Sequence, residues 1–422
     1  MTDQEAAPRT LLVTVTGPDR PGVTVQLFEA LSGPGVTVLD VEQVVVRGNL
    51  TLAVLVTVGG EEGGLIAAAH AAGVALGMRV TCVAGTGDNA PRRAGRLHVT
   101  IIGAPLLPVA VAGIAGALAA HGANIDRIRR LSRYPVTTVE FDVSGGDLDV
   151  LRRELAGEAS AHRVDMAISP AGLARQGRRL VVLDVDSTLI QDEVIDLLAQ
   201  RAGRQAEVSA LTRQAMQGDI DFATSLRQRV ALLAGLPVDA VDEVRHAVRL
   251  TPGARTLCRT LLRLGFTLGV VSGGFIEVVG PLAAGLGIRH AHANRLEVVD
   301  GRLTGRVIGE LVDRAGKAAA LIRFAHAEGL PLSRTVAIGD GANDLDMLAV
   351  AGLGVAFNAK PAVRAQVDTA VNVPYLDAVL YLLGIARADV EDADAADTAD
   401  RTDGTADMDD GAGAPVAAAT TP

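Results

Sequence analysis

An internal repeat near the N-terminus limits the folds open to the first part of this chain. Apolar strand patterns that end in glycine occur at Leu12–Gly17 and again 86 residues later at His98–Gly103. In each copy a helical apolar pattern follows, and further β-rich runs complete a βαββαβ unit. We therefore predict two small α+β domains, at 1–88 and 96–172, joined by a linker rich in glycine.

A different pattern begins near residue 179. Continuous apolar runs alternate with helical stretches from here on, at 180–183, 267–271, 335–338 and 354–357. Such runs are typical of a parallel sheet with helices on both faces. We predict a doubly wound α/β domain over 179–386, with a helical cap at about 192–250. The segment 388–422 contains no Leu, Ile or Phe, which predicts a disordered acidic tail.

Charge and composition restrict the partners of the chain. The formal net charge is −10, and residues 389–422 account for −9 of it with ten acids against Arg401, which leaves −1 for residues 1–388. A nearly neutral body with an acidic tail argues against nucleic acid and anionic membranes as partners. Aromatic residues make up only 2% of the chain, so few side chains are available to stack on bases.

The cysteines and the apolar runs indicate a cellular compartment. Cys82 and Cys258 are far apart and belong to no Cys-x-x-Cys motif, so we predict neither a disulfide nor a structural zinc site. The longest apolar run, Leu106–Ala120, is shorter than the roughly 20 residues that span a bilayer. The first residues of the chain are polar and do not resemble a signal peptide. We expect a cytoplasmic protein.

Two aspartates, Asp184 and Asp186, follow the first apolar run directly. Ligands of open parallel sheets bind beyond the carboxyl ends of the strands, and side chains two residues apart on an extended chain point to the same side. Such a pair can hold a hard cation and supply a nucleophile together with an acid–base group. A strand followed by an ordinary polar turn remains the alternative for this string alone.

A second acidic string follows the run at 335–338. Asp340 can supply a further carboxylate to a Mg²⁺ ion, and Asn343 and Asp344 can orient its ligands without touching it. Taken alone, the string also fits a common Asp-Gly turn.

Two further features suit a phosphate group. The run at 267–271 leads into Ser272 and Gly273, and the N–H groups of such a turn can cradle phosphate oxygens. Lys317, one of only two lysines, can neutralise both a carboxylate and a phosphate. Considered singly, a bland turn and a solvated lysine explain these residues equally well.

Taken together, the order Asp-x-Asp, Ser, Lys and Gly-Asp-x-x-x-Asp resembles the haloacid dehalogenase superfamily, over residues 180–377. The second aspartate is typical of the phosphatases in that superfamily. Several strings are most similar to those of phosphoserine phosphatases, namely Asp184–Glu193, Ser225–Val230, Val271–Phe275, Ala293–Leu296 and Gly339–Asp344. The resemblance implies hydrolysis of O-phospho-L-serine to L-serine and phosphate, as in the last step of serine biosynthesis.

The same resemblance assigns the catalytic roles. Asp184 is the nucleophile that forms an aspartyl phosphate, and Asp186 protonates the leaving serine oxygen and then activates water. Mg²⁺ is implied as the cofactor, held by the Asp184 side chain, a backbone carbonyl near Asp186, and Asp340.

The resemblance also assigns the substrate contacts. Ser272, Gly273 and Lys317 are implied to bind the phosphate, and Asn343 is a further substrate-binding residue. Glu193 and Arg229 on the cap would clamp the ammonium and carboxylate groups of the substrate, which suits their charges. Phe222 and Met216 would close the pocket against water.

The N-terminal repeat resembles ACT domains, the small regulatory modules that bind amino acids. The turn Gly17–Gly22 carries this resemblance, whereas the second copy, at Gly103–Pro108, lacks the Asp-Arg pair. A tight strand-to-helix turn without a ligand is the alternative. The resemblance implies a homodimer with L-serine as a possible effector.

Two other functions remain open from the residues. The chain could be a phosphatase or phosphotransferase of the same superfamily that acts on another small phosphate ester. It could instead be an amino-acid sensor with a vestigial catalytic domain, although the presence of Asp184, Asp186, Lys317 and Asp340 argues against this.

Overall fold

The computed structural model describes residues 7–89, 94–172, 177, 179–217, 220–367 and 369–395. The chain divides into two compact units, Met1–Arg92 and Arg93–Pro422, and we describe each by itself. No helix within the described ranges is long and apolar enough to cross a membrane.

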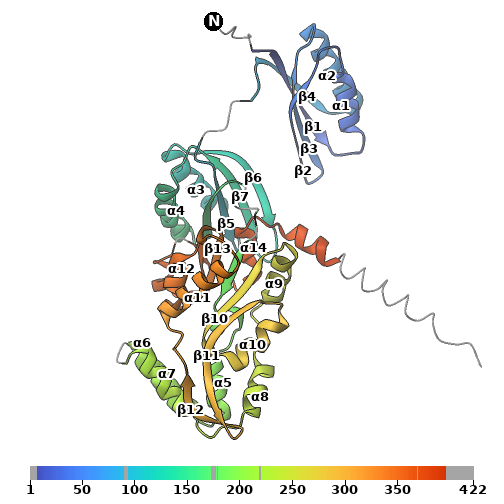
Figure 1. Cartoon of the computed structure of the whole chain (residues 1–422). Coiled ribbons are helices and arrows are strands. Elements are labelled where there is room, and N and C mark those ends of the chain that lie inside the picture. Colours follow the sequence, from blue (N-terminus) through green and yellow to red (C-terminus); the bar gives the residue numbers. More distant parts are fainter. Residues whose placement is uncertain are drawn as a thin grey trace, which may run out of the picture. The chain divides into compact units, whose positions relative to one another are not determined.

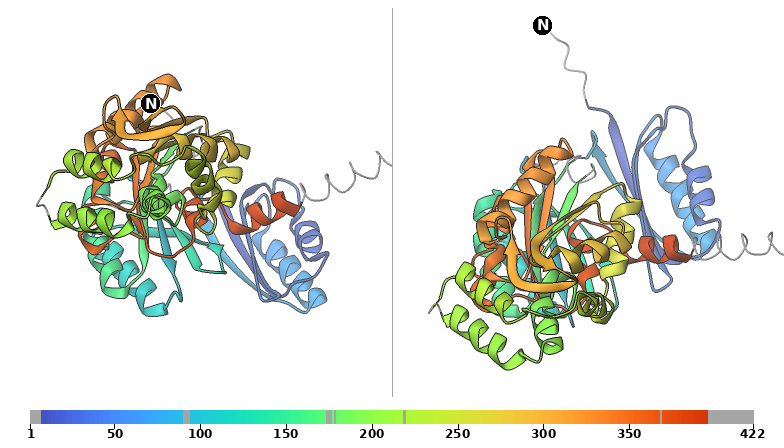
Figure 2. Two further views of the ribbon diagram at one scale, coloured as in Figure 1. Left: turned by 90° about the horizontal axis from the view of Figure 1, so that it is seen from below. Right: turned by 60° about the horizontal axis from the view of Figure 1, so that its bottom comes forward.

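The first unit is a four-stranded antiparallel sheet with two helices on one face (Figures 1 and 2). The strand order is β2-β3-β1-β4. Alternate residues of the central strand, such as Leu11 and Val13, are fully buried against Leu27 and other helix residues. The elements follow the predicted βαββαβ order, with β1 at Arg9–Pro18, α1 at Val23–Leu31, β2 at Val38–Val46, β3 at Asn49–Thr57, α2 at Glu62–Leu76 and β4 at Arg79–Thr86.

The second unit begins with a domain of the same topology, in the strand order β6-β7-β5-β8. One face of its sheet packs on α3 and α4 through residues such as Val99 and Phe141. The opposite face contributes Ile102, Leu131 and Ala167 to the core of the C-terminal domain. The bounds are β5 at Leu97–Gly103, α3 at Pro108–Ala120, β6 at Asn124–Ser132, β7 at Thr137–Ser144, α4 at Leu148–His162 and β8 at Asp165–Pro170.

A seven-stranded sheet in the order β12-β11-β10-β9-β13-β14-β15 forms the C-terminal domain. All neighbouring strands are parallel except β12, which pairs antiparallel with β11 at the edge. The bounds are β9 at Leu180–Leu183, β10 at Thr267–Phe275, β11 at His290–Val299, β12 at Arg302–Ile308, β13 at Thr335–Gly339, β14 at Leu353–Phe357 and β15 at Ala370–Val371.

Both faces of this sheet are buried, which explains the continuous apolar runs in the sequence. Leu180 and Val182 pack against α11 and α12, whereas Val181 and Leu183 face α9, α10 and α14. The helices of the C-terminal domain outside the cap are α9 at Ala254–Arg263, α10 at Ile276–Gly285, α11 at Arg314–Ala327, α12 at Leu345–Val350, α13 at Pro361–Arg364 and α14 at Val379–Leu382.

Four helices occupy the segment predicted as a cap, namely α5 at Val194–Arg201, α6 at Gln205–Gln217, α7 at Phe222–Ala231 and α8 at Asp239–Ala247. Figure 1 shows α6 and α7 beside each other, with α7 next to β12. The cap therefore covers the end of the sheet where β11 extends into β12.

Two features differ from the expectations. The sequence did not predict the hairpin of β11 and β12. β12 is an edge strand of mixed polarity, so it has no continuous apolar run that would indicate a strand. Residues 387–395 are helical, with Val390 buried in the core, whereas disorder was expected from 388 onward. The remainder of that predicted tail, 396–422, lies outside the described residues.

Candidate active site

The turn after β9 places the two predicted aspartates at the carboxyl end of the central strand. The Asp184 backbone N–H donates to the Ile338 carbonyl oxygen at 2.8 Å, which joins this turn to the neighbouring strand β13. Ser187 then adopts a positive φ of 58°, which turns the chain sharply toward the cap. The side chains of Asp184 and Asp186 therefore lie near the last residues of β10 and near the residues that follow β13.

Three carboxylates meet at this edge of the sheet. One oxygen each of Asp184, Asp340 and Asp344 lies within 4.8 Å of the other two. The Thr188 hydroxyl donates to Asp340 Oδ1 at 3.2 Å. The sequence predicted Asp184 and Asp340 as metal ligands, and the structure brings them together. Asp344, predicted only to orient ligands, lies among them.

Lys317 lies between two of these carboxylates. Its Nζ atom is 2.7 Å from Asp184 Oδ1 and 2.7 Å from Asp344 Oδ1, and the side chain is only 1% exposed. The Gly341 N–H donates to the other oxygen of Asp344 at 2.9 Å. Asp344 therefore fixes the position of Lys317. The two residues are 27 positions apart in the sequence, so no local pattern predicts this contact.

The cluster carries three acids against one lysine, and the pKa values reflect this excess. Burial and the neighbouring Asp344 raise the pKa of Asp184 well above its usual range, although Lys317 opposes that shift. Burial, again with Asp344, raises the pKa of Asp340 to about 6. Hard carboxylate oxygens with uncompensated negative charge are the donor set that Mg²⁺ prefers, so these residues fit a divalent cation.

Asp186 is held by hydrogen bonds from outside this cluster, although its charge still acts on Asp184. Its Oδ1 accepts from the Val194 backbone N–H at 2.8 Å, and its Oδ2 accepts from the Ser272 hydroxyl at 2.9 Å. Burial raises the pKa of the Asp186 carboxyl, which favours the protonated form that a general acid needs. The side chain is thus separate from the carboxylate group, and the metal contact through a backbone carbonyl near Asp186 stays a prediction.

The Ser272–Gly274 turn packs tightly against Asp186. The Ser272 hydroxyl accepts from the Gly274 N–H at 2.7 Å while it donates to Asp186. A Cβ atom at Gly274 would lie 2.9 Å from both Asp186 Oδ2 and Ser272 Oγ, so only glycine fits there. In this arrangement the Ser272 hydroxyl orients the Asp186 side chain; its predicted contact with phosphate stays a prediction.

Asn294 is a positioning residue for which the sequence analysis assigned no role. Its side chain is 1% exposed, donates to the Gly273 carbonyl oxygen at 2.8 Å, and accepts from the Val312 N–H at 2.9 Å. It therefore ties the Ser272–Gly274 turn to the segment that leads into α11 and Lys317. Asn294 belongs to the string Ala293–Leu296, which is similar to phosphoserine phosphatases, but no local pattern indicates these distant contacts.

Glu193 and Arg229 come from the start of α5 and from α7. The Glu193 carboxylate accepts from the Ser187 hydroxyl at 2.8 Å, and burial together with the nearby Asp186 raises its pKa to about 7. Burial lowers the pKa of Arg229, while the negative charges of Asp196 and Glu193 oppose that shift. The structure thus brings a carboxylate, Glu193, and a guanidinium, Arg229, from the cap close enough to Asp186 for their charges to interact.

Three other residues predicted to contact the substrate or close the pocket are Phe222, Asn343 and Met216. Phe222 lies over the end of β10, because the tip of its ring would lie 3.6 Å from a Cβ atom at Gly273. Asn343 is exposed at the turn after β13. The side chain of Met216 lies outside the described residues.

Comparisons with known proteins identify the families to which the domains are similar. The haloacid dehalogenase-like hydrolase family matches residues 181–349, and ACT domain families match residues 9–82 and 97–169. The phosphoserine phosphatase of Streptomyces coelicolor is 59% identical over 91% of this chain and 94% of its own length. The phosphoserine phosphatase of Mycobacterium tuberculosis is 49% identical over 92% and 96%.

Solved structures extend the likeness to the fold. The unliganded crystal structure of a probable phosphoserine phosphatase from Vibrio cholerae has a TM-score of 0.56 and 35% identity, and the match covers 68% of this chain and 87% of that one. A HAD family hydrolase from Salmonella enterica has a TM-score of 0.61 and 26% identity, over 68% and 98%. The chain therefore belongs to the phosphoserine phosphatases of the haloacid dehalogenase-like hydrolase family, with two ACT domains.

Proposed function

We propose that this protein is a Mg²⁺-dependent phosphatase that hydrolyses O-phospho-L-serine to L-serine and phosphate. The observation that carries the proposal is the cluster of Asp184, Asp340 and Asp344 around Lys317, beside a separately held Asp186. Asp184, Asp340 and the backbone near Asp186 would hold the metal, which supplies positive charge to a bound phosphate. Asp344 keeps Lys317 beside the nucleophile.

The reaction then uses two residues in two steps. Asp184 attacks the phosphorus, the bond from phosphorus to the serine oxygen breaks, and Asp186 donates its proton to that oxygen. Asp186 next takes a proton from water as the water attacks the phosphorus, and the bond to Asp184 breaks to release phosphate. Lys317 and the Gly273 N–H stabilise the negative charge on the phosphoryl oxygens.

Two cap residues select the substrate in this proposal. Arg229 pairs with the carboxylate of phosphoserine and the ionised Glu193 with its ammonium group. Phe222, which lies over Gly273, excludes water from the phosphate. A phosphate ester without these two charges would lack both contacts, which is the reason for preferring phosphoserine over other small esters.

The ACT domains supply the regulatory part of the proposal. Their match to the ACT domain family supports an amino-acid effector. We propose that this effector is L-serine and that the protein is a cytoplasmic homodimer. A serine titration should change the rate or the oligomeric state of the full chain. Unchanged values for both would remove this part of the proposal and leave the catalytic part intact.

The experiment that tests the substrate compares phosphate release from phosphoserine, phosphothreonine and glucose 6-phosphate. We expect the highest kcat/KM for phosphoserine, and we expect Glu193→Gln to lower that value at least tenfold, mainly through KM. A wild-type protein that hydrolyses glucose 6-phosphate as fast as phosphoserine would favour the alternative of another phosphate ester.

A further inference from the structure

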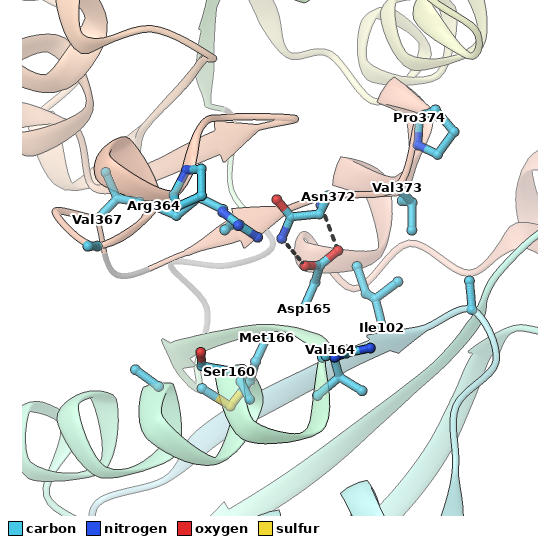
Figure 3. A pocket seen from close by; sticks show the side chains of 17 residues that line it. Ile102, Ser160, Val164, Asp165, Met166, Arg364, Val367, Asn372, Val373 and Pro374 are labelled. Atoms are coloured by element: carbon cyan, nitrogen blue, oxygen red, sulfur yellow. Dashed lines mark hydrogen bonds between the residues drawn. The ribbon is translucent and has the colours of Figure 1, made fainter.

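A hollow lies between the second ACT domain and the catalytic domain, away from the acidic cluster. Its volume is about 850 Å³, within the range of small-molecule sites. The ACT domain contributes Ile102, Val164 and Met166, and the catalytic domain contributes Val367 and Val373 (Figure 3). Both walls are therefore largely aliphatic.

One hydrogen-bonded pair joins the two walls. Asp165 Oδ2 accepts from the Asn372 backbone N–H at 2.7 Å, and Oδ1 accepts from the Asn372 side-chain amide at 2.5 Å (Figure 3). Asp165 is 8% exposed. Both oxygens of the acid in the hollow are thus already used to hold the domains together.

Two arginines line the same hollow from opposite sides. Arg163 belongs to the ACT domain and Arg364 to α13 of the catalytic domain. Arg364 extends toward Asn372 in Figure 3 and acts electrostatically on Asp165. Among the described residues neither guanidinium has an ion-pair partner within 4 Å. The hollow therefore combines excess positive charge with aliphatic walls.

The internal repeat shows that Arg163 is not required by the backbone. It ends the 15-residue helix α4 in a left-handed conformation with φ 55°. The equivalent position in the first copy, after the 15-residue helix α2, is Gly77 with φ 63°. Glycine adopts this conformation more readily than arginine. The second copy nevertheless has arginine at this position, which places a guanidinium at the hollow.

We propose that this hollow binds a small organic anion with an aliphatic body, either a carboxylate or a phosphate monoester. The anionic group would pair with Arg163 and Arg364, and the aliphatic part would pack on Ile102, Val164 and Met166. Since the walls come from two domains, a bound anion stabilises their docking and raises the unfolding midpoint of the unit 93–422.

Titration calorimetry of the full-length protein tests this site with octanoate, octyl phosphate and octanol as probes. We expect at least one of the two anions to bind and octanol not to bind. Arg163→Gly, which restores the residue of the first copy, and Arg364→Ala should each weaken binding about tenfold. Phosphoserine hydrolysis without added anion should be unchanged in both variants.

Two matched variants locate the binding. Arg153→Ala removes an exposed arginine of α4 that does not line the hollow, and it should bind the anion as the wild type does. Arg229→Ala removes the cation proposed for the substrate and should also leave the affinity unchanged. No binding of either anion at 10 mM, equal binding of octanol, or wild-type affinity in the Arg163→Gly/Arg364→Ala double variant would overturn the proposal.

Discussion

Lys317 lies buried between Asp184 and Asp344, and its charge compensates part of their repulsion. We predict that Lys317→Met lowers the free energy of unfolding of the metal-free protein by about 3–5 kcal/mol, because removal of one partner leaves buried charge uncompensated. Urea denaturation measures this change. Adding Asp344→Asn should recover part of the loss.

Lys360 offers a matched control for this experiment. It is the only other lysine and is exposed, so Lys360→Met should change the free energy of unfolding by less than about 0.5 kcal/mol. Equal effects of the two lysine substitutions would contradict the role assigned to Lys317.

The raised pKa values of Asp340, about 6, and Glu193, about 7, predict how stability depends on pH. Both carboxyls bind protons more tightly in the folded protein than in the unfolded chain, where their pKa values are near 4. The free energy of unfolding of the metal-free protein should therefore fall as the pH rises from about 4 to about 7.

Asp340→Asn isolates one of these groups. For Asp340 the shift of about two units corresponds to a loss on the order of 3 kcal/mol. Thermal unfolding in a chelator at pH 5, 6, 7 and 8 should show a flatter pH dependence for Asp340→Asn than for the wild type. The same slope in both proteins would refute the assignment.

At the scale of elements, the end of β13 depends on a residue without a side chain. A Cβ at Gly339 would lie 2.5 Å from Asp344 Cγ, so Gly339→Ala must displace Asp344 from Lys317. We predict a loss of about 1–3 kcal/mol in the free energy of unfolding and a large loss of phosphatase activity. Gly280→Ala in α10, where the nearest atoms are 3.9 Å away, should retain activity.

The sequence predicted the buried strands well, because burial on both faces leaves a continuous apolar run. Leu180–Leu183 is found as β9, and Asp184 after β9 meets Asp340 after β13. β12 was missed, since an edge strand of mixed polarity has no such signature. The contacts of Asn294 and of Asp344 with Lys317 depend on tertiary packing, which no local spacing encodes.

At the scale of the molecule, the second ACT domain has a core of its own but also contributes one face of its sheet to the core of the catalytic domain, whereas the core of the first unit contains residues of that unit alone. Calorimetry should therefore show one transition for the unit 93–422 and a separate one for the first unit. Leu131→Ala, at the shared core, should lower the larger unit's free energy of unfolding by about 2–5 kcal/mol.

Leu27→Ala in the core of the first unit is the matched substitution. It should lower only the transition of that unit and leave the thermal inactivation of phosphatase activity unchanged. If Leu131→Ala left the inactivation temperature at its wild-type value, the shared core would not contribute to the stability of the catalytic domain.

The most direct test of the central claim is phosphate release from O-phospho-L-serine by metal-stripped protein during a titration with Mg²⁺. We predict no release without metal, saturable activation by Mg²⁺, and loss of at least three orders of magnitude in kcat for a folded Asp184→Asn variant. Full release in the presence of a chelator, or wild-type turnover by Asp184→Asn, would contradict a mechanism in which Asp184 is the nucleophile at a metal-binding carboxylate cluster.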